Sequence, residues 1–164
     1  MDELLVLVNE NDEVIGEVWR SEANSNPKAI HREISILIHD NQEKLLLQQR
    51  SKTKKIKPGY WTNACAGHVL KDQSPEETAH KELTEELGFN TELKFIKKDF
   101  EQLKNETRFD YCYLGEYNDK KFILQEEEVE RVKFFDRDEY LKLENTGKVD
   151  STSMKWIRGY WEIK

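Results

Sequence analysis

The stretch Gly67-His68-Val69-Leu70-Lys71-Asp72-Gln73-Ser74-Pro75-Glu76-Glu77-Thr78-Ala79-His80-Lys81-Glu82-Leu83-Thr84-Glu85-Glu86-Leu87-Gly88-Phe89 contains the clearest helix signal in the chain. Ser74 is a favoured N-cap, Pro75 suits the first helical position, and Glu77 completes a Ser-x-x-Glu capping box. Gly88 supplies the C-terminal stop, so the stretch predicts a helix of about thirteen residues that ends at Leu87.

This helix carries an acidic cluster beside its apolar stripe. Glu82, Glu85 and Glu86 are spaced three and four residues apart and are therefore neighbours on the helix surface. Like charges in this arrangement destabilise an isolated helix, which suggests that a positive partner offsets them. Mg²⁺ prefers oxygen ligands and is often held by one or two carboxylates together with substrate phosphate. The cluster therefore predicts a divalent-cation site, and a solvated acidic face is the alternative.

Length and composition limit the remaining possibilities. The chain has 164 residues, 37% of them hydrophobic, and a formal net charge of −7. We expect one domain over residues 1–164, no membrane span, and no sequence-independent binding to nucleic acid. The acidic start at Met1 and the presence of only two cysteines predict a cytoplasmic protein without a secretory signal or disulfides.

Apolar runs and turn residues predict the other elements. Strands and helices are interspersed, which indicates an α/β or α+β layered domain. Residues 1–28 are expected to form N-terminal strands and a polar linker. The predicted strands cover residues 4–8, 14–19, 34–38, 44–48, 93–96, 109–114 and 132–135, extended chain covers 61–69, and helices cover 136–143 and 153–161.

The segment 67–89 resembles the Nudix box, G-x5-E-x7-R-E-U-x-E-E-x-G-U, in which U is apolar. Two positions depart from this pattern, because Gln73 replaces the first Glu and Lys81 replaces the Arg. The resemblance implies a mixed β-sheet sandwiched between helices, with Mg²⁺ or Mn²⁺ held against a diphosphate. The matching positions are Gly67, Glu82, Leu83, Glu85, Glu86, Gly88 and Phe89.

The resemblance also assigns roles to residues of the box. It implies that Glu82, Glu85 and Glu86 are the catalytic and metal-binding carboxylates and that Gly67 contributes a backbone carbonyl to the metal. The general base is Glu82 or a carboxylate outside the box, and the acidic run at 126–130 offers Glu127 or Glu128.

Further segments are similar to the Nudix branch that includes isopentenyl-diphosphate isomerase. The isomerase uses a Cys directly before the Gly-His pair, whereas this chain has Ala66 there and Cys65 one residue earlier. A shift of one residue in a strand turns a side chain to the opposite face. The similar segments are residues 7–16, 31–33, 45–50 and 58–63.

Other isomerase positions are also changed. Its Glu-x-Glu falls on Arg108 and Asp110, and of its metal-binding histidines only His31 and His68 have counterparts, because the third falls near Asn24. These changes favour an isomerase-like Nudix hydrolase that acts on nucleoside diphosphates or their derivatives. The isomerase, and a diphosphate-binding module weakened by the two changes in the box, remain the alternatives.

A basic loop precedes the box. Residues 50–57 hold five Lys and Arg and no acid, and Arg50 and Lys57 are the candidates for binding the phosphates. His68 and Glu127 are further candidates for substrate binding, and Tyr60 and Trp61 either stack on a base or pack in the protein. The apolar residues of the last helix are expected to pack on the domain, with a homodimer surface as the alternative.

Overall fold

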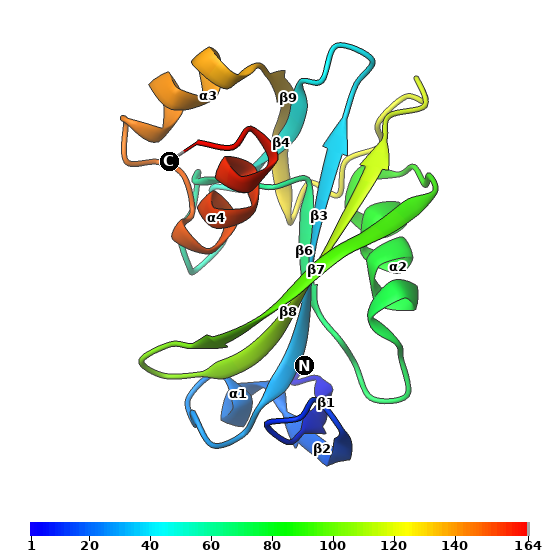
Figure 1. The fold of residues 1–164 in the computed structure, drawn as a ribbon, viewed down its shortest axis with the longest axis vertical. Coiled ribbons are helices and arrows are strands. Elements are labelled where there is room, and N and C mark those ends of the chain that lie inside the picture. The colour runs from blue at the N-terminus through cyan, green and yellow to red at the C-terminus, as the bar shows by residue number, and fades with distance from the viewer. Residues whose placement is uncertain (164) are drawn as a thin grey trace.

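A computed structural model describes residues 1–163 and confirms the α+β class. A curled mixed sheet lies between helices, with α2 on one side and α3 and α4 on the other (Figure 1). The elements in chain order are β1 (Leu4–Val8), β2 (Val14–Trp19), α1 (Arg20–Ala23), β3 (His31–His39), β4 (Leu45–Arg50), β5 (Trp61–Thr62), β6 (Cys65–His68), α2 (Pro75–Leu87), β7 (Leu93–Gln102), β8 (Thr107–Glu116), β9 (Val129–Phe135), α3 (Arg137–Glu144) and α4 (Ser151–Tyr160).

Strand β3 organises the sheet. It pairs in parallel with β8 and antiparallel with β6, and it meets β4 only at the pair His39 and Leu45. Strands β3 and β4 therefore pair only beside the turn that joins them, because most of the hydrogen-bonding groups of β3 are used by other strands. Strand β4 pairs instead with β5 and β9. The sheet therefore has two parts, one built on β3 and one on β4, which meet at the turn between these two strands.

Helix α2 begins and ends where the sequence predicts. The Ser74 side chain accepts a hydrogen bond from the backbone N–H of Glu77, and the Glu77 carboxylate accepts one from the N–H of Ser74, which completes the capping box. Gly88 adopts a left-handed conformation with φ of 71°, and a Cβ there would lie 2.5 Å from Cβ of Ile123. The helix end therefore requires glycine for both its backbone angle and its close packing.

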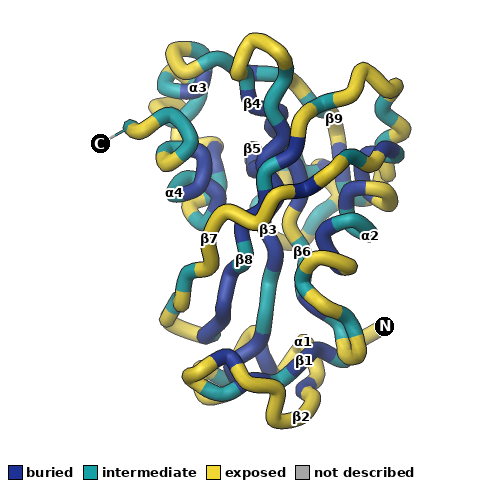
Figure 2. Tube along the Cα trace, turned by 45° about the vertical axis from the view of Figure 1, so that its right-hand side comes forward, coloured by how far each residue is buried: buried dark blue, intermediate teal, exposed yellow. Residues whose placement is uncertain are grey.

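Two main apolar clusters lie on opposite faces of the sheet. One packs the buried side of α2, including Leu83 and Leu87, against the strands. The other packs α4, through Trp156 and Ile157, as the sequence predicts for the last helix. Figure 2 shows these buried segments as dark blue, and most of β7 as exposed.

Several element boundaries differ from the prediction. The polar linker was expected to cover residues 21–28, but its first three residues, 21–23, belong to the short helix α1. Strands β7 and β8 extend well beyond 93–96 and 109–114, and they pair from Leu93 with Gly115 to Gln102 with Thr107. The outer part of β7 is charged and exposed, so backbone pairing with β8 stabilises it without an apolar signal in the sequence.

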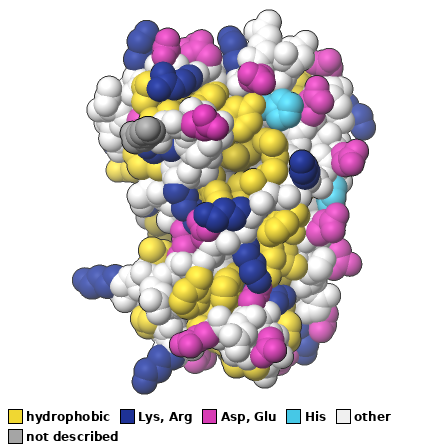
Figure 3. Space-filling model, viewed as in Figure 1, with side chains coloured by type: hydrophobic (Ala, Val, Ile, Leu, Met, Phe, Trp, Pro, Cys, Tyr) yellow, Lys and Arg dark blue, Asp and Glu magenta, His cyan; other side chains and the backbone are white. Residues whose placement is uncertain are grey.

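The surface carries mixed charge. Lys and Arg are interspersed with Asp and Glu over the face shown in Figure 3. None of the helices in the described part of the chain is long and apolar enough to cross a membrane.

Candidate active site

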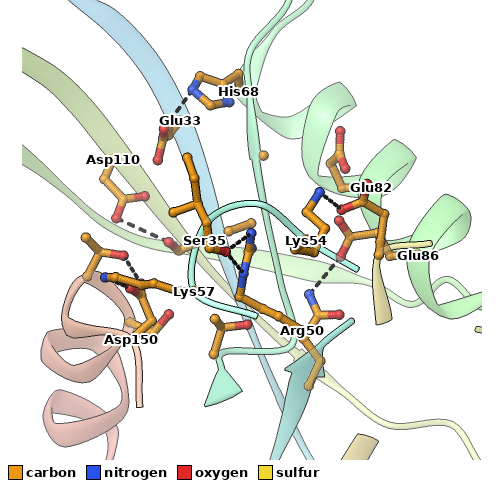
Figure 4. Close-up of a pocket in the computed structure, with 18 of the residues that line it drawn as sticks. Glu33, Ser35, Arg50, Lys54, Lys57, His68, Glu82, Glu86, Asp110 and Asp150 are labelled. Atoms are coloured by element: carbon orange, nitrogen blue, oxygen red, sulfur yellow. Dashed lines mark hydrogen bonds and ion pairs between the residues drawn. The ribbon is translucent and has the colours of Figure 1, made fainter. Parts of the chain in front are cut away.

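A cavity of about 480 Å³ lies where β3, β4 and β6 meet α2. The loop between β4 and β5 contributes basic side chains to it, and the start of α4 contributes Thr152 and Ser153. Figure 4 shows the α2 glutamates on one side of this cavity and Glu33 and Asp110 on the other, with the basic side chains between them. The cavity therefore brings together segments that are far apart in the sequence.

The three α2 glutamates line the cavity at different depths. Glu86 is 8% exposed and accepts a 2.8 Å hydrogen bond from Nε2 of Gln48, Glu82 is half-buried, and Glu85 is exposed. Burial raises the pKa of Glu86 and of Glu82 to about 7. Within residues 1–163 neither carboxylate lies within 4.0 Å of a Lys, Arg or His nitrogen, so each buried negative charge lacks a direct positive partner.

Gly67 lies against this cluster. A Cβ at this position would lie 2.7 Å from Cδ of Glu82, so any larger residue would displace the carboxylate. The fold thus gathers Gly67, Glu82, Glu85 and Glu86, the set that the resemblance predicts for the metal. Carboxylate oxygens and water are the ligands that Mg²⁺ accepts, so the residues present fit a hard divalent cation.

The basic loop is held over the cavity by carboxylates. Nζ of Lys54 lies 2.6 Å from Oε2 of Glu128, and Lys57 pairs with Asp150. The Arg50 guanidinium donates two hydrogen bonds, of 3.0 and 3.2 Å, to a backbone carbonyl of its own loop. Of the four predicted substrate-binding residues, three line the cavity, namely Arg50, Lys57 and His68.

The late acidic run contributes a different residue from the one predicted for substrate binding. Glu127 is exposed and does not line the cavity, whereas Glu128 does. The reason is local, because Glu128 is the residue that pairs with Lys54 just before β9 begins.

A second group of polar residues lies on β3, β6 and β8. His31, Glu33 and His68 each offer one ligand atom, and these three atoms all lie within 4.8 Å of one another, close enough for one cation. The Arg108 guanidinium already neutralises this group, since its NH1 lies 2.7 Å from Glu33 and 3.2 Å from Glu106. Burial alone raises the pKa of Glu33, but His68, His31 and Arg108 outweigh it and hold that pKa well below its usual value.

Comparison with known proteins identifies the family. A NUDIX domain model matches residues 29–157. This chain belongs to the Nudix family. The chain is 37% identical over 139 residues to isopentenyl-diphosphate Delta-isomerase 2 of Photorhabdus laumondii, covering 82% of this chain and 77% of that protein.

Two further comparisons agree with the family. An uncharacterized Nudix hydrolase of Listeria monocytogenes is 30% identical over 143 residues, with 87% of this chain and 85% of that protein covered. The crystal structure of DR0079 from Deinococcus radiodurans matches with a TM-score of 0.76 at 21% identity, covering 90% of this chain and 91% of that one. The predicted Nudix fold is thereby confirmed.

In this Nudix protein His31 and His68 match the isomerase resemblance, but the positions of its thiol and of its Glu-x-Glu carry other side chains. Ala66 is exposed and lines the cavity, whereas Cys65 is fully buried with Sγ 3.9 Å from the backbone oxygen of Glu82. Burial raises the pKa of the Cys65 thiol well above its ordinary value. Asp110 is also buried, and its Oδ2 accepts hydrogen bonds from Trp156 and Ser35 at 2.6 and 3.2 Å.

Several residues of the site have no role in the sequence prediction, among them Gln48, Glu33 and Asp150, and Lys54 enters it only as a member of the basic loop 50–57. One signal is available for β3, because polar residues at 31, 33 and 35 share one face of a strand whose second half is mostly apolar. A polar face on a central strand indicates a site, since such side chains must find partners. Neither the pairing of Lys57 with Asp150 nor that of Gln48 with Glu86 had a sequence signal.

Proposed function

We propose that this Nudix protein hydrolyses a diphosphate linkage in a small molecule, such as a nucleoside diphosphate derivative, with Mg²⁺ or Mn²⁺. The observation that supports this most is the convergence of Glu82, Glu85 and Glu86 beneath Gly67, with two of the carboxylates partly or fully buried and without a positive partner. Such a group holds excess negative charge that a divalent cation would neutralise.

The cation would be held by the three α2 carboxylates and by the backbone of Gly67. When bound, it would neutralise charge on the phosphoryl oxygens and activate water. The role of Gln48 is to fix the Glu86 carboxylate, because its amide donates to Oε2. Lys81 partly takes the place of the Arg in the family pattern, since it favours the charged form of Glu82 but lacks a planar fork of donors.

The basic loop would bind the diphosphate. Lys54 and Lys57 are held in the cavity wall by Glu128 and Asp150, so a phosphate could approach them without their first becoming ordered. Both Glu82 and Glu128 line the cavity, and either carboxylate would accept the proton of the attacking water. A Glu128→Gln variant that keeps wild-type kcat would assign this proton transfer to Glu82.

The test is phosphate release from a panel of nucleoside diphosphate derivatives with Mg²⁺ or Mn²⁺. We expect Glu86→Gln to lower kcat by ~100-fold or more, and the Glu76→Gln control, on the exposed first turn of α2, to leave it unchanged. Equal rates for wild type and Glu86→Gln, or no release by either, would contradict the proposal. Affinity without turnover would favour the binding module that Gln73 and Lys81 suggest.

Isomerisation of isopentenyl diphosphate is the second candidate, because several relatives are named as that isomerase. The exposed face of β6 offers Ala66 where the isomerase resemblance requires a thiol, so we expect no dimethylallyl isomer from the wild-type protein at high concentration. Accumulation of that isomer by the wild type but not by Glu86→Gln would establish the isomerase and displace the hydrolase.

A further inference from the structure

The cavity is unusual in its lack of apolar lining. Small-molecule sites are generally lined by hydrophobic and aromatic side chains with a few polar groups. Of the residues described as lining this cavity, none is Phe, Tyr or Trp, and Ile56 is the only large aliphatic one. Ile56 is 71% exposed, which places it at the rim rather than in the interior.

This lining offers little to a nucleobase or an isoprenyl group. A base gains affinity by stacking on aromatic rings, and an isoprenyl group gains affinity by leaving water for apolar surface. The two predicted stacking candidates do not serve here, because neither Tyr60 nor Trp61 lines the cavity. Trp61 is 5% exposed and packs edge-on against Phe135, with ring centroids 5.1 Å apart.

The side of the cavity opposite α2 is rich in hydrogen-bonding groups. Figure 4 shows Glu33, Ser35 and Asp110 there, on β3 and β8. Asp110 is 2% exposed, and its Oδ1 has no hydrogen-bond partner among the described residues. Oε1 of Gln48, which also belongs to the lining, is buried and unpartnered in the same way. Buried acceptors without donors are costly, so the cavity calls for a ligand that donates hydrogen bonds.

We propose that the group attached to the diphosphate is a small polyhydroxylated one, a sugar or polyol, whose hydroxyls bind Asp110, Glu33 and Ser35. Hydroxyls both donate and accept, so they can satisfy Oδ1 of Asp110 while accepting from neighbouring donors. This inference rests on the proposed diphosphate function and adds the chemical class of the attached group. A base or an isoprenyl chain contributes no recognition.

The test compares binding of methylene-bridged analogues by calorimetry in Mg²⁺, because a P–C–P bridge resists hydrolysis. The ligands are methylenediphosphonate, the ribose 5-diphosphate analogue, the ADP analogue and the isopentenyl diphosphate analogue. We expect the ribose analogue to bind about tenfold tighter than methylenediphosphonate, since new hydrogen bonds to hydroxyls form. The ADP analogue carries the base in place of the anomeric hydroxyl of the ribose analogue, and we expect this exchange to change affinity by less than about threefold.

A matched pair of variants locates the effect. Asp110→Asn places an amide donor or a neutral acceptor where the carboxylate stood, and we expect it to abolish the gain from ribose while leaving methylenediphosphonate affinity unchanged. Asp99→Asn is the control, because Asp99 is the strand partner of Asp110 and also lies within 4.0 Å of Lys155 but does not line the cavity. Ser35→Ala, a smaller change in the same wall, provides a second test should Asp110→Asn fail to fold.

The outcomes separate this inference from the proposed function. No binding of methylenediphosphonate with Mg²⁺ would contradict the diphosphate function itself. Binding of methylenediphosphonate with no gain from ribose, or with a tenfold gain from adenine or the isopentenyl group (about 1.4 kcal/mol), would overturn the sugar or polyol assignment alone.

Discussion

Glu86 on α2 and Cys65 on β6 show how burial acts on a single side chain. Burial raises the pKa of both the Glu86 carboxylate and the Cys65 thiol. The consequences differ, because a buried thiol is neutral and packs as a small apolar group, whereas a buried carboxylate that is ionised needs a positive partner. The ionised Glu86 carboxylate is therefore expected to lower the stability of the fold, although it supports the proposed function.

Removing the Glu86 charge should stabilise the metal-free protein. At pH 8 we expect Glu86→Gln to raise the free energy of unfolding by about 1–2 kcal/mol, because the variant no longer buries an unpaired charge. Urea denaturation in EDTA measures this difference. Addition of Mg²⁺ should then stabilise the wild type more than the variant, and a variant that is less stable than wild type in EDTA would contradict the explanation.

The two faces of β6 should differ in thiol reactivity. We expect Cys65 and Cys112, both buried, to resist iodoacetamide in the folded protein at pH 8, and a cysteine introduced by Ala66→Cys to react at least ~100-fold faster. Mass spectrometry of labelled peptides gives the rates, and labelling in urea, where all the thiols should react, is the control. Rapid labelling of Cys65 in the native wild type would show that it is not in the core.

At the scale of elements, Asp12 fastens the turn between β1 and β2 to the central sheet. Its carboxylate accepts hydrogen bonds from Arg32 on β3 at 2.7 Å, from Lys98 on β7 at 2.5 Å, and from Tyr111 on β8. Burial alone raises the pKa of Asp12, but the hydrogen bonds from Lys98, Tyr111 and Arg32 outweigh it and lower that pKa. One side chain therefore ties the N-terminal strands to three others.

The stabilisation that the Asp12 carboxylate provides should depend on pH. Because the pKa of Asp12 is lower in the folded state than the unfolded value of 3.8, its stabilisation is present above that value and is lost as pH falls through the folded pKa. We expect Asp12→Asn to lower the free energy of unfolding by about 2 kcal/mol at pH 7 and by less at pH 3, which lies below the unfolded value. Denaturant titrations at the two pH values provide the measurement, and an equal loss at both would exclude the charge as the cause.

For the whole molecule, net charge and local charge differ. The chain carries a net charge of −7, yet the loop 50–57 holds five basic residues and no acid. The tertiary structure places basic side chains of that loop beside the acidic edge of α2, in the lining of one cavity (Figure 4). An acidic protein can thus bind an anionic diphosphate, because the field at the site is set by nearby charges rather than by the total.

The basic loop offers a test of this local field. We expect Lys57→Gln to raise KM by about tenfold, with little change in kcat, and to weaken the dependence of KM on salt. Lys55→Gln is the matched control, because Lys55 is exposed in the same loop and does not line the cavity. Steady-state kinetics at low and high salt measure both effects, and equal changes in the two variants would contradict a specific role for Lys57.

The sequence predicts the local parts of the fold well. The capping box at Ser74, the stop at Gly88 and the apolar side of α4 depend on residues close together in the chain, and the structure confirms them. The predicted strands 93–96 and 109–114 are shorter than β7 and β8. The outer parts of these two strands are held by backbone pairing with each other, which no side-chain pattern reveals. The candidate metal ligands, Glu82, Glu85, Glu86 and Gly67, could be predicted from one helix and the family pattern alone. Their role as a metal site stays a prediction.

The sequence by itself determined α2, its acidic edge, the Nudix resemblance and the one-residue shift that separates Cys65 from Ala66. The helix, its acidic edge and the one-residue shift follow from helical and strand periodicity, which operate over a few residues, and the resemblance follows from the motif at residues 67–89. Only the tertiary structure decided that Asp110, Gln48 and Glu128 share one cavity with α2, and that Phe, Tyr and Trp are absent from its described lining residues. The physical reason is that β3 takes β8 and β6 as partners while β4 pairs with β5 and β9, and strand pairing over long sequence distances leaves no local signal.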